Sequence, residues 1–218
     1  MIAESNPGLL QTDFGRRIHD LVKSGEYVEA FTLWGEGMLA GQDPLAGQNA
    51  LTLSIWERLT ASAEAFNQPG IFTALIGYEW TSSPGGNNLH RNVIFRDGKD
   101  QADRVLPFSN YDSSDPEDLW DWMAAYQEKT GGWVPAIAHN GNLSNGLMFD
   151  VVTLTDRRPL DRDYAERRMV WEPLYEVTQI KGISGSAAGS IDGSVHALVR
   201  SRGTSNLEHS RISNTERS

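Results

Sequence analysis

The chain has 218 residues, of which 39% are hydrophobic and none is cysteine, and its formal net charge is −10 at pH 7. This composition is that of a globular protein with a real core, and it excludes disulfides and thiolate metal sites, so that His, Asp, Glu or water would hold any metal. The negative charge argues against nucleic acid as a partner, and no apolar run reaches the ~20 residues of a membrane span, so small molecules or cations are the expected partners.

The first third of the chain is predicted to be helical. Residues 12–67 carry apolar side chains at helical spacing, and Gly25, Gly35, Gly37 and the stretch GQDPLAGQ divide them into three helices. Residues 71–78 (IFTALIGY) then form a short, continuous apolar run, which predicts a strand covered on both faces.

Helical and strand-like segments alternate in the rest of the chain. They are a β-like run at 90–95, a helix from Asp115 to Gly131, a strand at 133–138, a charged segment at 157–168 that is helical near its end, and a strand at 174–180. This alternation predicts an α/β fold with a mainly parallel sheet, in which ligands gather at the carboxyl ends of the strands. Residues 183–218 are rich in serine and lack apolar periodicity, so we expect a disordered or non-native tail after a domain at residues 1–182.

Three candidate metal ligands stand at the ends of the predicted strands. Glu79 ends one apolar run, His90 opens the next, and His139 ends the run WVPAIA, each beside a loop rich in Gly or Asn. A carboxylate and two imidazoles suit Zn, Mn or Fe, and a hydrolytic site would use such an ion to lower the pKa of a bound water. The alternative interpretation is structural, with Glu79 paired with Arg91 or a helix N-terminus and each histidine serving only as a strand-end residue.

Polar residues near these ligands are candidates for substrate binding or for orienting the ligands. The loop HNGNLSNG, which begins at His139, is rich in amides and suits a polyhydroxylated or anionic ligand, although a tight turn explains the same composition. Glu176 is an acid within an apolar strand and is interpreted as a ligand, a base or a solvent-facing residue; Lys181 would bind a phosphate or carboxylate, or is simply solvated. The candidates are Asn140, Asn142, Asn145, Glu176 and Lys181.

Three long motifs, GYEWTSSPGGNNLHRNVIF, AHNGNLSNG and YEVTQIKG, resemble the bacterial domain-of-unknown-function 3604 family, which is similar to the polymerase-and-histidinol-phosphatase (PHP) metallohydrolase superfamily. The resemblance covers most of residues 6–182. It implies a distorted (β/α) barrel of parallel strands with a two- or three-metal centre at their C-terminal ends. It also implies that Glu79 is an acidic, bridging ligand, that His90 and His139 are the later histidine ligands, and that Glu176 is a further polar residue at a strand end.

The chain departs from the family at both ends. Members usually open with a His-x-His strand and a later Asp-His strand end, neither of which occurs here, and they continue past QIKG with a further ligand motif. The resemblance therefore implies an internal fragment, an incomplete barrel that retains about half of a metal centre and is weakly active or inactive. The first residues lack the pattern of a signal peptide, but because the true start is in doubt the compartment, periplasmic or cytoplasmic, stays open.

The expected function is that of an uncharacterised metal-dependent hydrolase, in which a metal-bound hydroxide attacks a phosphoester. A glycoside or another ester is the alternative substrate for the same fold. A non-catalytic carbohydrate-binding module or an inactive remnant is the alternative from a different class, with Trp120 and Trp122 as a sugar platform, although core packing is the favoured interpretation of these two side chains. The sequence contains no P-loop, no GxSxG and no dinucleotide fingerprint, so it does not support those enzyme classes.

Overall fold

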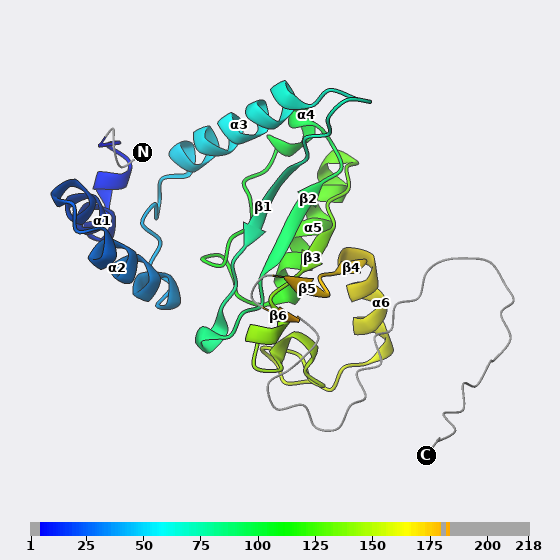
Figure 1. Cartoon of the computed structure of the whole chain (residues 1–218). Helices are drawn as coiled ribbons and strands as arrows, with labels where there is room; N and C mark the ends of the chain where they lie inside the picture. The colour runs from blue at the N-terminus through cyan, green and yellow to red at the C-terminus, as the bar shows by residue number, and fades with distance from the viewer. Residues whose placement is uncertain (1–4, 180–181, 184–218) are drawn as a thin grey trace, which may run out of the picture.

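The structure, a computed structural model, describes residues 5–179 and 182–183, and it combines helices with a small mixed sheet (Figure 1). The helices are α1 (Asp13–Ser24), α2 (Tyr27–Leu39), α3 (Asn49–Phe66), α4 (Lys99–Ala102), α5 (Pro116–Thr130) and α6 (Arg162–Trp171). The strands are β1 (Ile76–Trp80), β2 (Arg91–Phe95), β3 (Ala136–Ala138), β4 (Leu174–Tyr175), β5 (Thr178–Gln179) and β6 (Gly182–Ile183). Of the helices in these residues, none combines the length and apolar character that a membrane crossing requires.

Three helices form within residues 12–67 as predicted, but the break expected at Gly35 and Gly37 is not seen, because α2 continues through both to Leu39. The ends of α1 follow from local chemistry. The Thr12 side chain accepts a hydrogen bond from the Gly15 N–H at 2.9 Å, which caps α1, and Gly25 ends the helix with a left-handed φ of 87°. Gly37 of α2 lies directly against the ring of Phe14 in α1, where any larger side chain would collide with it. The two helices therefore pack closely at this point.

The prediction of a mainly parallel sheet is wrong. The four-stranded sheet has the order β1-β2-β3-β4, in which β1–β2 and β2–β3 are antiparallel and only β3–β4 is parallel. The connection between β1 and β2, residues 81–90, is shorter than the roughly dozen residues that a parallel crossover needs. Among the described residues the strands form an open sheet, so the barrel implied by the family resemblance is not seen.

Two predicted strands differ from those in the structure. The run at 71–78 becomes a strand only from Ile76. The residues before β1 are joined to the chain only by an isolated bridge between Gln68 and Phe72, and Ile71 is 84% exposed. The run at 174–180 is divided between β4 and β5, and β5 pairs with β6 in a separate two-stranded sheet. Residue 180 and the Ser-rich segment from 184 onward lie outside the described residues.

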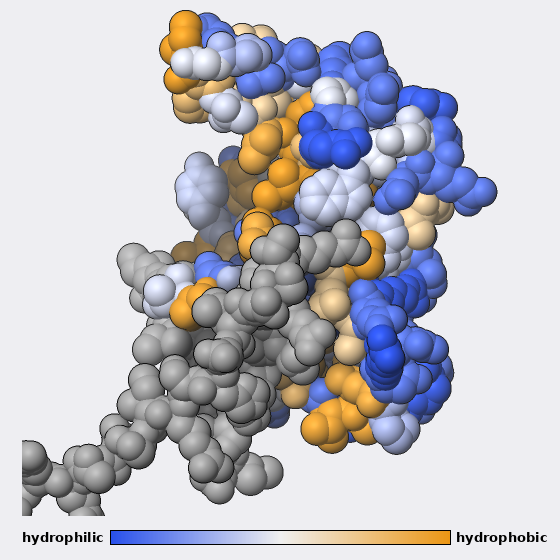
Figure 2. All heavy atoms as spheres, turned by 90° about the vertical axis from the view of Figure 1, so that its right-hand side faces the viewer, coloured by the Kyte–Doolittle hydropathy of each residue, from blue (hydrophilic) through white to orange (hydrophobic). Residues whose placement is uncertain are grey.

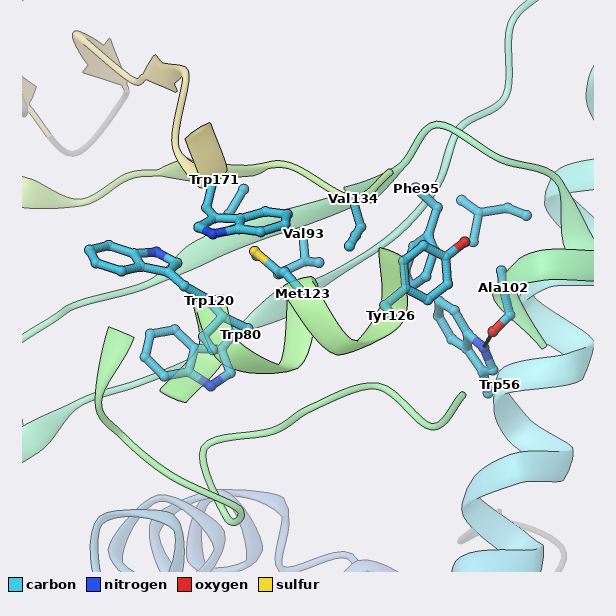
Figure 3. Packing of buried hydrophobic residues seen from close by; sticks show 13 residues of the cluster. Trp56, Trp80, Val93, Phe95, Ala102, Trp120, Met123, Tyr126, Val134 and Trp171 are labelled. Atoms are coloured by element: carbon cyan, nitrogen blue, oxygen red, sulfur yellow. Dashed lines mark hydrogen bonds between the residues drawn. The ribbon is translucent and has the colours of Figure 1, made fainter. Parts of the chain in front are cut away.

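The hydrophobic core lies between α5 and one face of the sheet (Figure 3). Asp115 caps α5 by accepting a hydrogen bond from the Glu117 N–H at 2.9 Å, which confirms the helix start predicted there. The residues that fill the core are aromatic to an unusual degree: Trp56, Trp80, Phe95, Trp120, Tyr126 and Trp171. Full burial of one such side chain contributes roughly 1.5–3 kcal/mol to stability, so this layer fixes the sheet on the helix.

Large apolar side chains also remain on the surface. On α2, Tyr27, Val28 and Phe31 are 66–75% exposed, and Leu174 and Val177 near the edge strand β4 are 62% and 69% exposed. Figure 2 shows that hydrophobic residues reach the surface in patches between hydrophilic ones on the face turned to the viewer.

Candidate metal centre

The sheet topology brings three strand ends to one edge. Arg91 pairs with Trp80 in β1 and with Ala138 in β3, and because β2 runs antiparallel to both neighbours, its beginning meets their carboxyl ends. Glu79 therefore lies near the end of β1 beside His90, and the His139 N–H donates to the His90 carbonyl at 3.1 Å. In a parallel sheet the beginning of β2 would lie at the opposite edge, away from Glu79.

The alternation of side chains along β1 directs Glu79 away from the core. Tyr78 and Trp80 pack in the hydrophobic core, so the side chain between them points to the other face of the sheet. The Glu79 side chain is 44% exposed, whereas the side chains of His90 and His139 are 13% and 10% exposed. The carboxylate is thus open to solvent, and the two imidazoles are embedded beside it.

The three side chains form a compact group of oxygen and nitrogen donors. Glu79 Oε1 lies 3.0 Å from His90 Nδ1 and 3.2 Å from His139 Nε2, and the candidate ligand atoms of the three residues all lie within 4.8 Å of one another. The imidazole rings are nearly perpendicular, with their centroids 5.7 Å apart. These are the three residues that the sequence analysis named as candidate ligands, and the structure brings them together from three different strand ends.

The loop between β1 and β2 orients His90. The Ser83 hydroxyl lies 3.1 Å from His90 Nε2, which leaves Nδ1 facing Glu79. A hydrogen-bond partner on the second ring nitrogen fixes the orientation of a metal-binding histidine. Sequence reasoning missed Ser83, and its only signal was its place in the Gly/Asn-rich loop, where Gly85 and Gly86 take left-handed φ values of 59° and 83°.

The residues after His139 hold a strained turn. Asn140 is buried and has a left-handed φ of 60°, and its N–H donates to Glu176 Oε2 at 3.2 Å. Glu176 reaches this turn because β4 runs parallel to β3, so that both strands end at the same edge. The Asn140 side-chain amide lies 3.4 Å from His90 Nδ1. Two of the predicted polar residues, Asn140 and Glu176, therefore border the centre.

The other predicted polar residues contribute less to this geometry. Asn142 is half-buried in a short 3₁₀ helix, Gly141–Leu143, and Asn145 is exposed with a left-handed φ of 51°. Lys181 lies outside the described residues. The aromatic pair of α5 is not a sugar platform, because Trp120 is fully buried and Trp122 stacks on Phe108 and Tyr126.

Arg91 is not the partner of Glu79. The structural interpretation paired these two residues, but the guanidinium of Arg91 points into the core, where its Nε donates to Glu172 Oε1 at 2.9 Å. The Glu79 carboxylate instead contacts the imidazoles of His90 and His139. The pairing with Glu172 spans 81 residues of sequence, and no local pattern indicates it.

The donor set fits a divalent ion. One carboxylate oxygen and two imidazole nitrogens are ligands of Zn, Mn or Fe, and two donors bound to one ion at ~2.1 Å in tetrahedral geometry stand ~3.4 Å apart. The separations of 3.0 and 3.2 Å from Glu79 to the imidazoles are close to that value. His139 Nδ1 is buried without a hydrogen-bond partner among the described residues, so this ring, unlike that of His90, is not held from its second nitrogen.

Comparison with known proteins identifies a family. The sequence model of a family described as a protein of unknown function (DUF3604) matches residues 3–192, so the match includes the whole described fold and extends into the Ser-rich segment. No curated protein and no solved structure matches the chain.

Proposed function

The chain belongs to the DUF3604 family of proteins of unknown function, and from the geometry of its centre we propose that it is a metal-dependent hydrolase in which Glu79, His90 and His139 hold one divalent ion. The observation that carries this proposal is the convergence of the three donors within 4.8 Å at one edge of the sheet. Three protein ligands leave a position open for water or substrate, which is the arrangement of catalytic rather than structural sites.

The residues around the centre have separate tasks in this proposal. A divalent ion there would lower the pKa of a water molecule and neutralise developing negative charge on the substrate. Ser83 holds the ring of His90 from its far nitrogen, and Glu176 holds the turn that follows His139. The exposed carboxylate of Glu79 marks the side from which a substrate can approach.

A phosphoester is the proposed substrate class. The similarity of the motifs to PHP metallohydrolases supports it, and the oxygen and nitrogen donors suit an ion that binds phosphoryl oxygens. A glycoside or another ester is the second candidate, because the open side of the centre at Glu79 does not restrict the substrate to a phosphoester.

The proposal is tested by metal-dependent turnover. The purified chain is assayed on phosphomonoester, phosphodiester and aryl-glycoside model substrates with added Mn or Zn, alongside His139→Ala and Glu79→Ala. His19→Ala is the control, because this histidine lies in α1, with its ring nitrogens on Ser5 and Asp20. We expect weak turnover, as for a partial metal centre, that the two site variants abolish and the control retains. Absence of metal-dependent turnover on every substrate, or equal loss in the control, would contradict the proposal.

A further inference from the structure

A buried ionic cluster lies beside the metal centre, on the opposite face of the sheet. It consists of Arg91, Glu172 and Arg168, and the side chains of Arg91 and Glu172 are each only 2% exposed. Ions removed this completely from water are costly unless every charge is paired and hydrogen-bonded. The proposed hydrolytic function uses none of the three residues directly.

Glu172 is fully satisfied within the cluster. One of its oxygens accepts from Arg91 Nε at 2.9 Å and from Trp120 Nε1 at 3.0 Å, and the other accepts from Arg168 Nε at 3.0 Å. Burial alone would raise the pKa of Glu172, but the two guanidinium charges and these hydrogen bonds hold it below its usual value. The carboxylate is therefore a fixed, charged anchor between α5, α6 and β2.

The anchor reaches the backbone on both sides of His90. Arg91, held by Glu172, donates from Nη1 to the Leu89 carbonyl, so its side chain folds back past the peptide of His90. The Leu89 N–H donates to the Ser82 carbonyl at 2.9 Å, and the His90 carbonyl accepts from His139 at 3.1 Å. Every residue of the segment 89–91 is thus tied to a neighbouring element.

We propose that Arg91 is a positioning residue for the metal centre: held by Glu172, it fixes the backbone of His90 so that Nδ1 faces Glu79 and the His90–His139 contact is kept. This inference rests on the proposed metal site. A ligand side chain that is already oriented in the metal-free protein gives tighter metal binding, because no free energy is spent on ordering that side chain when the ion binds. A lysine at this position retains the charge but lacks the fork that reaches both Glu172 and Leu89.

The test compares Arg91→Lys with Arg168→Lys. Both changes alter a guanidinium bonded to Glu172. The other contacts of Arg168 are the Met148 carbonyl at 2.9 Å and the Phe149 ring, and among the described residues it has no hydrogen bond to the Leu89–Arg91 segment. We expect Arg91→Lys to weaken Zn binding about 10- to 100-fold, as loss of a supporting contact does, and Arg168→Lys to leave it near the wild-type value. Affinity is measured by isothermal titration with Zn, and thermal unfolding of the metal-free proteins shows that both variants fold.

Hydrogen exchange gives a readout that needs no metal. The amide of His139 is bonded to the His90 carbonyl, so it should exchange faster in Arg91→Lys than in Arg168→Lys when the two have similar stability. Equal affinities or equal exchange in the two variants would overturn the positioning role. If the wild type binds no Zn, the proposed function fails, and the exchange comparison still decides whether Arg91 fixes this segment. If Arg91→Lys does not fold, the double variant Arg91→Met/Glu172→Gln, which removes both charges of the buried pair, replaces it, and its Zn affinity and His139 exchange are compared with those of Arg168→Lys.

Discussion

Replacing Glu79 by glutamine should remove metal binding while leaving the fold intact. The side chain is 44% exposed, and glutamine keeps an oxygen that can accept from the two imidazoles at 3.0 and 3.2 Å, so we expect the metal-free stability to change by less than ~0.5 kcal/mol. The charge of the acidic ligand is lost, however. Supporting contacts are typically worth ~10- to 100-fold in metal affinity, so loss of a charged ligand should cost at least ~100-fold.

Thermal unfolding with and without metal converts this loss into a measurable shift. Zn at 100 times the wild-type dissociation constant stabilises the folded chain by ~2.7 kcal/mol, and at ~2–4 °C per kcal/mol for a chain of this size the Tm rises by ~5–11 °C. With a 100-fold weaker constant the same Zn concentration gives Glu79→Gln only ~0.4 kcal/mol, or ~1 °C. Glu128→Gln, at an exposed position of α5, makes the same charge change away from the centre and should shift as the wild type does. An equal Zn shift in Glu79→Gln would refute the role given to this carboxylate.

Three further predictions follow from single contacts. Ser83→Ala removes the hydroxyl from His90 Nε2 and should lower Zn affinity about 10-fold at an unchanged Tm, as titration calorimetry and thermal unfolding will show. Asn140→Ala should cost ~1–2 kcal/mol in urea unfolding because of the φ of 60°, whereas Asn140→Gly should cost less. The pKa of Glu172 is lowered in the folded chain, so the ionised carboxylate stabilises the fold above a pH of about 4.5, and this stabilisation is lost as the pH falls through the pKa of the folded state. The difference in unfolding free energy between the wild type and Glu172→Gln should therefore become smaller from about pH 7 to about pH 3.5.

The helices could be predicted from the sequence because their ends are marked by single residues. Thr12 and Asp115 begin helices as side-chain caps, and Gly25 and Gly131 end them with left-handed φ values of 87° and 70°. These signals act within a few residues, so they can be recognised in the sequence without knowledge of the fold.

The direction of the strands could not be read from their composition. Continuous apolar runs are typical of parallel strands, but in the run at 71–78 only the residues from Ile76 belong to β1, and Ile71, Phe72 and Leu75 before it are exposed. The length of the connection at 81–90 was the better signal, since it permits only a tight return. That return is also what places His90 beside Glu79.

The grouping of the three candidate ligands could be predicted from the sequence, whereas the residues that support them could not. The residue types and their positions at strand ends indicated Glu79, His90 and His139, whose convergence the structure shows. Arg91 and Glu172 lie 81 residues apart, and their pairing depends on the packing of α6 against α5, so no local pattern predicts it. Binding of a metal at the centre stays a prediction.

X-ray absorption of the Zn-loaded chain tests the central claim most directly. We predict one Zn per chain with nitrogen and oxygen neighbours at ~2.0–2.1 Å and the multiple scattering of two imidazoles, reduced to one imidazole in His139→Ala. A Zn environment without imidazole scattering, or one that His139→Ala leaves unchanged, would contradict the assignment of Glu79, His90 and His139 as a metal centre.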